Sequence, residues 1–232
     1  MGLPSQVHTL VFDVFGTIFD LEESLAGPLG SFLRERGTSL NVQEAWARWR
    51  YRQRIEQYQD NLLLMGHVGY LDAARRALLY VLRQFGIPFT EEEVTSLMEA
   101  WRELTSFPDV VTGLHKLKTR YRLVILSNGE RWVLEYLVRD RIQFDFDRLI
   151  SVEEAGVFKP HPAVYRMAAR LLEAEPHELM LVSSNSFDLM GARSCGYRGA
   201  WVDRYGLPFE ETPFQPDIVV RDFVELATCL CS

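Results

Sequence analysis

The chain has 232 residues and a formal net charge of -7, and 47% of its residues are hydrophobic. This length allows one large core, or a core with a smaller insert, and the apolar content is enough to fill it. Because nucleic acids and anionic membranes bind broad basic surfaces, the acidic balance argues against both as partners.

The N-terminal segment and the cysteines bear on the compartment. Residues 1–7 contain no basic stretch followed by an apolar one, and nothing in the chain reaches the roughly 18 apolar residues of a membrane span. The three cysteines, Cys195, Cys229 and Cys231, lack the paired spacing of metal ligands. We therefore expect reduced thiols in a cytoplasmic protein.

The first predicted element is an apolar strand over 8–12, followed by the run Asp13-Val14-Phe15-Gly16-Thr17. Gly16 provides the conformational freedom for a turn directly after the strand. A carboxylate placed where a strand gives way to a loop can act as a nucleophile. Asp13 is therefore the first candidate catalytic residue.

A helical insert is predicted next. No convincing strand appears between Phe19 and Phe107, whereas apolar residues recur at helical spacing over 42–65, 70–85 and 91–104. We expect 1–18 and 107–232 to form a catalytic core and 19–106 to form a helical cap. Ligands of open parallel sheets bind beyond the carboxyl ends of the strands, so an insert that leaves there would cover the site. Asp109 is expected to cap the helix that runs to Arg120.

The rest of the chain alternates short apolar runs with helical segments. The runs lie at 123–126, 149–152, 179–182, 200–202 and 218–220. This alternation predicts an α/β fold, with a Rossmann-like parallel sheet and helices on both of its faces.

Polar residues follow two of these strands. Ser127-Asn128-Gly129 forms a turn that can bind an anion through backbone N–H groups, although such turns also occur for geometry alone. Lys159 follows the next strand and is either a solvated surface charge or a partner that points back toward Asp13. Pro162 is expected to open the following helix.

The fourth core strand ends in Ser183-Ser184-Asn185-Ser186-Phe187-Asp188. One interpretation is the start of a helix, with Asn185 or Ser186 as its cap and Asp188 in its first turn. Capping explains one or two of these residues. It does not explain so many polar residues at four strand ends.

With these motifs in order, the chain resembles the type II haloacid dehalogenases, also called L-2-haloacid dehalogenases, over almost its entire length. The motifs are Asp13 to Thr17, Ser127 to Gly129, Lys159-Pro160, and Ser183 to Asp188 continuing to Arg193. Phosphatases of the same superfamily carry a second aspartate at the position of Phe15 and a metal-binding aspartate at that of Ser184. A hard cation such as Mg²⁺ would lose much of its oxygen shell here, which favours a dehalogenase without metal or organic cofactor.

The resemblance implies a role for each matching residue. Asp13 would be the nucleophile, with Thr17 hydrogen-bonded nearby and Lys159 paired with it. Ser127, Asn128 and Phe15 would contact substrate, and Tyr165 would complete the polar surround. Ser183, Asn185 and Asp188 would hold the nucleophile and position the attacking water.

The cap is expected to add one arginine to a halide cradle. Arg48, Arg50, Arg52 and Arg54 alternate along one predicted helix and could equally form an exposed basic face. Arg50 is the preferred candidate, because Trp46 lies four residues before it on the same helix face. Arg54 is the second candidate.

The reaction implied is hydrolysis of a small 2-haloalkanoic acid to a 2-hydroxy acid through an ester on Asp13. The alternatives are a magnesium-dependent phosphatase that borrows an acid such as Glu153 or Glu154, another hydrolysis by Asp13, and a non-catalytic binder of small carboxylates. The family resemblance and the apolar run Leu62-Leu63-Leu64-Met65 also suggest a homodimer.

Overall fold

The computed structural model describes residues 6–231, which divide into two compact units. The sheet unit takes the chain up to Phe19 and again from Ser106, and the helical unit is Asp20–Thr105. The expected cap corresponds to the helical unit, and its function as a cover stays a prediction. No helix within the described residues is both long and apolar enough to cross a membrane.

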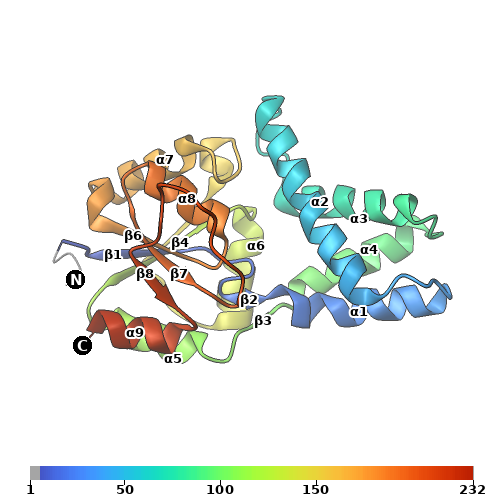
Figure 1. Ribbon diagram of the computed structural model, residues 1–232, viewed down its shortest axis with the longest axis horizontal. Helices are drawn as coiled ribbons and strands as arrows, with labels where there is room; N and C mark the ends of the chain where they lie inside the picture. The colour runs from blue at the N-terminus through green and yellow to red at the C-terminus, as the bar shows by residue number, and fades with distance from the viewer. Residues whose placement is uncertain (1–5, 232) are drawn as a thin grey trace. The chain divides into compact units, whose positions relative to one another are not determined.

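The sheet unit is built on six parallel strands (Figure 1). Their spatial order is β5 (Arg148–Ser151), β4 (Arg122–Ser127), β1 (Thr9–Phe12), β6 (Leu179–Ser183), β7 (Arg198–Val202) and β8 (Ile218–Val220). All six predicted strands are thus confirmed, and no end differs from its predicted position by more than two residues. The α/β fold class is confirmed as well.

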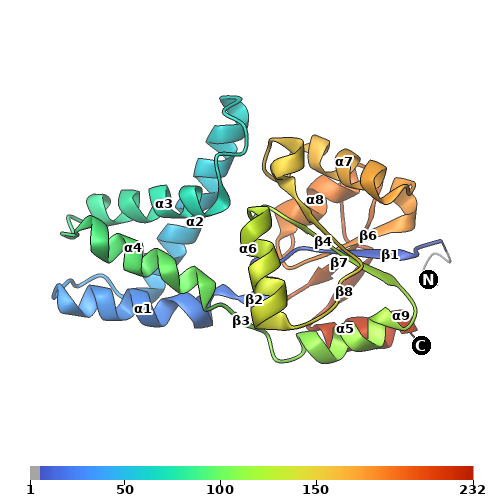
Figure 2. The same ribbon diagram turned by 180° about the vertical axis from the view of Figure 1, so that it is seen from behind.

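Helices cover both faces of this sheet. Figures 1 and 2 show α5 (Val110–Lys118) and α9 (Phe223–Cys231) together on one face, and α7 (Pro162–Leu172) and α8 (Ser186–Ser194) on the other. The remaining helical segments are α6 (Arg131–Tyr136), η2 (Leu137–Ile142), η3 (Val152–Ala155) and η4 (Pro176–Glu178). Because both faces are covered, β1 is apolar after its first residue, Thr9, and Leu10, Val11 and Phe12 are fully buried.

The order of the strands locates the site. The chain builds outward from β1 to β4 and β5 on one side, and from β1 to β6, β7 and β8 on the other. The direction of winding therefore reverses at β1, and ligands of such sheets bind beyond the carboxyl end of the strands at this reversal. Asp13 directly follows β1.

The helical unit contains α1 (Leu21–Glu35), α2 (Val42–Leu62), α3 (Tyr70–Gln84), α4 (Glu91–Glu99) and the short η1 (Ala100–Arg102). Three of the helices begin at residues whose side chains accept a backbone N–H of the first turn, namely Asp20, Asn41 and Thr90. Two short strands, β2 (Phe19–Asp20) and β3 (Thr105–Ser106), pair with each other at the junctions.

Three local expectations were wrong or incomplete. The sequence patterns did not predict α1, which contains Gly27, Pro28 and Gly30, residues of low helix propensity. The two-residue strand β3 lies inside a region expected to have no strand. Asp109 precedes α5 but its side chain does not cap that helix, and it accepts instead from the backbone N–H of Phe223, the first residue of α9.

Candidate active site

The carboxylate of Asp13 is buried, and its two oxygens have different surroundings. Oδ2 accepts hydrogen bonds from Asn185 Nδ2 at 2.7 Å, Thr17 Oγ1 at 2.8 Å and Ser183 Oγ at 3.3 Å. Oδ1 accepts from Lys159 Nζ at 3.3 Å. Oδ2 is therefore crowded by donors, and Oδ1 is the oxygen with more freedom to form a new bond.

The hydroxyl of Thr17 has a defined direction. The backbone N–H of Ser184 donates to Thr17 Oγ1 at 2.9 Å, so this oxygen already accepts one hydrogen bond. Its single proton is directed to Asp13 Oδ2. The turn that permits this arrangement depends on Gly16, whose φ is +84°.

The ammonium group of Lys159 is fully engaged by the protein. Its Nζ contacts Asp188 Oδ2 at 2.7 Å, Leu126 O at 2.6 Å and Asp13 Oδ1 at 3.3 Å, and the side chain is 1% exposed. Burial alone would lower the pKa of Lys159, but the charges of Asp188 and Asp13 outweigh it and raise the pKa. Lys159 is thus not a surface charge, and its three protons are already directed at protein oxygens.

Asp188 binds Lys159, and Tyr165 in turn binds Asp188. Tyr165 Oη donates to Asp188 Oδ1 at 2.6 Å, and both side chains are buried. Burial raises the pKa of Asp188 to about 6, although the charge of Lys159 opposes the rise. Burial, reinforced by Asp188, raises the pKa of Tyr165 well above its ordinary value. A Cβ atom at Gly191 would lie 2.6 Å from Tyr165 Oη, so glycine is required there.

Ser127 and Asn128 form the turn beside this group. Asn128 Oδ1 accepts from the backbone N–H of Lys159 at 2.8 Å, and Ser127 Oγ accepts from Gly129 N at 3.2 Å. A Cβ atom at Gly129 would come within 2.9 Å of the Phe15 ring, so Phe15 packs against the turn.

Asn185 is not a capping side chain. It precedes α8, but it makes no side-chain cap hydrogen bond, and its amide donates to Asp13 Oδ2 and to Phe15 O at 3.0 Å. Asn185 thus occupies the N-cap position, as one interpretation expected, but its side chain does not bond the first turn of α8. Its side-chain amide instead donates to two residues of the loop after β1, Asp13 and Phe15.

Arg50 lies in the helical unit among aromatic residues. Its guanidinium stacks on the Trp46 ring at 5.7 Å, donates to Tyr70 Oη at 3.1 Å and contacts Gln53. Arg48 and Arg54 are exposed, whereas Arg50 is half-buried, so the arginines of α2 are not a uniform solvated face. The relation of Arg50 to Asp13 stays a prediction.

Two residues that hold the loop after β1 were missed by sequence reasoning. Arg204 Nη2 donates to Thr17 O at 3.2 Å, and Tyr205 Oη donates to Gly16 O at 3.3 Å. They follow β7 directly, so the same signal that found the other residues, a polar run after a parallel strand, was present in Asp203-Arg204-Tyr205.

The residues expected of a magnesium-dependent phosphatase are not found at the corresponding places. Within residues 6–231, no three side chains of His, Cys, Asp or Glu are grouped so that they could hold a metal ion. Glu153 and Glu154, the alternative acids, are exposed. The backbone N–H of Arg131 donates to Glu153, and the guanidinium of Arg131 forms an ion pair with Glu154.

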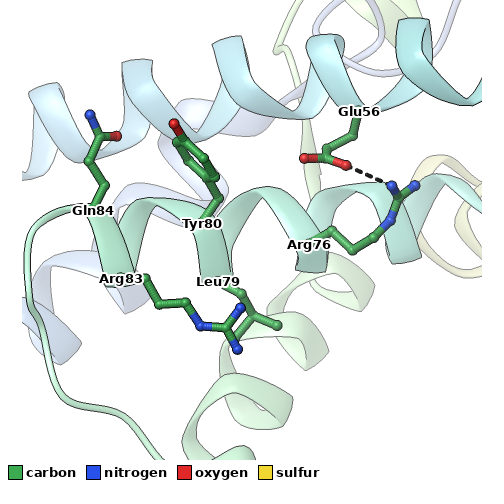
Figure 3. Close-up of a pocket in the computed structure, with 6 residues that line it drawn as sticks. All are labelled: Glu56, Arg76, Leu79, Tyr80, Arg83 and Gln84. Atoms are coloured by element: carbon green, nitrogen blue, oxygen red, sulfur yellow. Dashed lines mark hydrogen bonds and ion pairs between the residues drawn. The ribbon is translucent and has the colours of Figure 1, made fainter.

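A separate hollow lies in the helical unit (Figure 3). It is lined by Glu56, Arg76, Leu79, Tyr80, Arg83 and Gln84. Arg76 turns to Glu56 and also binds Asp60 and Asp72. These ion pairs join α2, which carries Glu56 and Asp60, to α3, which carries Asp72 and Arg76.

Comparison with known proteins agrees with this geometry. A family model described as haloacid dehalogenase-like hydrolase matches residues 7–196. The chain is 32% identical to (S)-2-haloacid dehalogenase 2 of Pseudomonas sp. (strain CBS-3), over 97% of this chain and 96% of that protein. It is 31% identical to haloacetate dehalogenase H-2 of Moraxella sp. (strain B), over 93% and 94%.

A solved structure extends the similarity to the fold. The L-2-haloacid dehalogenase of Xanthobacter autotrophicus, with chloropropionic acid covalently bound, has a TM-score of 0.84 and 27% identity, covering 97% of this chain and 99% of that one. The chain belongs to the haloacid dehalogenase-like hydrolases and, within them, to the type II or L-2-haloacid dehalogenase family.

Proposed function

We propose that this protein is an (S)-2-haloacid dehalogenase, which hydrolyses small 2-haloalkanoic acids to 2-hydroxy acids. The observation that carries the proposal is the asymmetric environment of Asp13, with three donors on Oδ2 and Lys159 on Oδ1. The covalent adduct of chloropropionic acid in the Xanthobacter autotrophicus relative supports the same kind of intermediate.

In the first step, Oδ1 of Asp13 attacks the carbon that bears the halogen. A C–O bond forms, the carbon–halogen bond breaks, and the halide leaves with the bonding electron pair, so the configuration at carbon inverts. The hydrogen bonds to Oδ2 fix the plane of the carboxylate before the attack, which lowers the entropic cost of alignment. Lys159 offsets the negative charge brought in by the carboxylate of the substrate.

In the second step, water attacks Cγ of Asp13 and the bond between Cγ and the ester oxygen breaks. One proton of the water passes to the leaving oxygen, which gives the 2-hydroxy acid, and the other is released to solvent, so that Asp13 returns to its carboxylate form. Charge develops on Oδ2, where Thr17, Ser183 and Asn185 already direct donors, so these three residues act as an oxyanion hole. Asp188, or Asn185, orients the attacking water.

The halide needs its own stabilisation as it leaves. We assign this role to Arg50 of the helical unit together with Asn128, and Arg50 is preferred to Arg54 because it is half-buried against Trp46. Phe15 and Ser127 then line the space for the substrate, with Tyr165 holding Asp188. In this proposal the helical unit acts as the cap.

Three further properties belong to the proposal. The reaction proceeds without metal or organic cofactor, because Asp13 supplies the nucleophile and protein donors replace the cation. The protein acts in the cytoplasm. It forms a homodimer through the exposed run Leu62, Leu63, Leu64 and Met65, whose side chains are 82%, 70%, 85% and 55% exposed.

The test is a single turnover of (S)-2-chloropropionate in water enriched in oxygen-18. We expect the label in the peptide that contains Asp13 and not in the lactate released in that turnover, because water attacks the ester carbonyl. Label in the product with an unlabelled Asp13 peptide would reject the ester route. Hydrolysis of phosphate esters that depends on Mg²⁺ would favour the phosphatase alternative.

A further inference from the structure

Three consecutive carbonyl groups of the loop after β1 are each held by a side chain from another part of the sheet unit. Phe15 O accepts from Asn185, Gly16 O from Tyr205 and Thr17 O from Arg204. These donors lie about 170 to 189 positions further along the chain. Residues 13–17 are buried, and buried peptide carbonyls need hydrogen-bond partners within the protein, so this set of contacts fixes the path of the loop.

Arg204 is the most firmly anchored of the three donors. Its side chain is 4% exposed, its Nη1 donates to Asp109 Oδ1 at 2.7 Å, and its guanidinium stacks on the Phe107 ring at 4.1 Å. Asp109 is itself held by the backbone N–H of Phe223 at 2.8 Å. The guanidinium therefore presents a rigid donor to Thr17 O, which a flexible lysine could not do while also binding Asp109.

The position of Thr17 matters because its hydroxyl serves Asp13. The proton of that hydroxyl points at Oδ2, and its direction depends on where the Thr17 backbone lies relative to Ser184 N. A shift of the Thr17 carbonyl would lengthen the hydrogen bond to Oδ2. In the proposed mechanism Oδ2 carries little new charge in the first step and becomes the oxyanion in the second.

We infer that Arg204, assisted by Tyr205, is a positioning residue that aligns Thr17 for hydrolysis of the ester on Asp13, an inference that rests on the proposed function. Asp109 acts through Arg204. Their effect falls on the second chemical step more than on the first.

The experiment compares Arg204→Lys with the wild type in rapid-quench turnover of (S)-2-chloropropionate. Chloride release in the first turnover reports the attack by Asp13, and the mass of the Asp13 peptide reports the ester. We expect ester hydrolysis to slow about tenfold in Arg204→Lys, while first-turnover chloride release changes by less than about threefold, because a displaced oxyanion donor costs less than the 10²–10³ of a deleted one. The ester should therefore accumulate.

Tyr205→Phe is the second variant, because it removes only a hydroxyl from a side chain that is 46% exposed. We expect it to keep the wild-type melting temperature and to slow ester hydrolysis by about twofold to threefold, since it removes one neutral hydrogen bond that acts only indirectly on Asp13. The matched control is Arg198→Lys, an arginine at the other end of β7 that binds Asp217 and does not contact the loop after β1.

Each outcome decides the inference. Accumulated ester in Arg204→Lys, with normal partitioning in Arg198→Lys, supports it. Three results would overturn it and leave the proposed function intact. In Arg204→Lys, first-turnover chloride release and ester hydrolysis could slow equally, or neither could change. Alternatively, the rate of ester hydrolysis could fall in proportion to the melting temperature in both Arg204→Lys and Arg198→Lys. A wild type that releases no halide from any 2-halo acid would remove the proposed function and this inference together.

Discussion

The sheet unit and the helical unit each contain a cluster of charged side chains, and the two clusters are built differently. In the sheet unit, Lys159 lies between Asp13 and Asp188, and the three side chains are 1%, 8% and 1% exposed. They come from three segments far apart in the chain. In the helical unit, Arg76 binds carboxylates of α2 and α3, and its side chain is 31% exposed.

The two clusters also differ in the free energy needed to bury their charges. Burying two carboxylates with one ammonium group leaves a net negative charge in a desolvated place, which is expensive and is found where chemistry requires it. The cluster around Arg76 reaches water through Asp72, whose side chain is 51% exposed, and it joins two neighbouring helices. We therefore expect the first cluster to determine the reaction rate and the second to determine stability, and four predictions test this division.

The largest effect is expected from removal of the nucleophile. Asp13→Asn should reduce halide release at least 10⁴-fold, since losing a covalent nucleophile removes the chemical route itself. Asp60→Asn is the matched change in the helical unit, where the side chain is 1% exposed and bound to Arg76. It should lower the free energy of unfolding by about 1–3 kcal/mol with little change in kcat. A large loss of kcat in Asp60→Asn would contradict the division.

Removal of the two central cations is the second comparison. Lys159→Met leaves Asp13 and Asp188 buried together, so we expect the free energy of unfolding to fall by about 3–5 kcal/mol and turnover to fall by about 10³-fold. Arg76→Met should destabilise the protein by less, because Asp72 and part of the cluster remain hydrated. Chemical denaturation and steady-state halide release measure the two quantities. Equal losses of activity in both variants would refute the distinction.

Arg50 is the expected exception within the helical unit. Arg50→Ala should lower kcat by about 10²-fold, as expected when a donor to a developing charge is lost. Arg54→Ala, which changes an exposed arginine on the same helix, should stay within about twofold of the wild type because surface charges contribute little. Steady-state kinetics with bromo and chloro substrates measures both. The opposite ranking would transfer the halide role to Arg54.

The smallest effect is a pH dependence. Burial raises the pKa of Asp188 to about 6, so on acidification its carboxylate takes up a proton near that pH, where an ordinary aspartate would still be charged. Ester hydrolysis should then slow about tenfold per pH unit below this point. In Tyr165→Phe the carboxylate loses a donor that favours its charged form, and the acid limb should move to higher pH. A limb that stays in place would exclude Asp188 as its origin.

The sequence by itself determined the sheet and most of the residues around Asp13. Six apolar runs gave six parallel strands, because a strand covered on both faces is apolar throughout its length. Polar residues directly after those strands are candidates for one site, since the carboxyl ends of parallel strands lie on one edge. Asp13, Lys159 and Ser183 were found in this way.

Only the tertiary structure decided how the side chains are used. Asn185 has the sequence of a helix cap but donates to Asp13, and Asp109 accepts from Arg204 and Phe223 instead of capping α5. Likewise, the polar run after β7 places Arg204 and Tyr205 at the edge of the sheet, but only the tertiary structure shows that they donate to the loop after β1. The hydrogen-bond partners of these side chains depend on which distant segments the packed sheet brings together. The local sequence pattern indicates only the secondary structure that each segment prefers on its own.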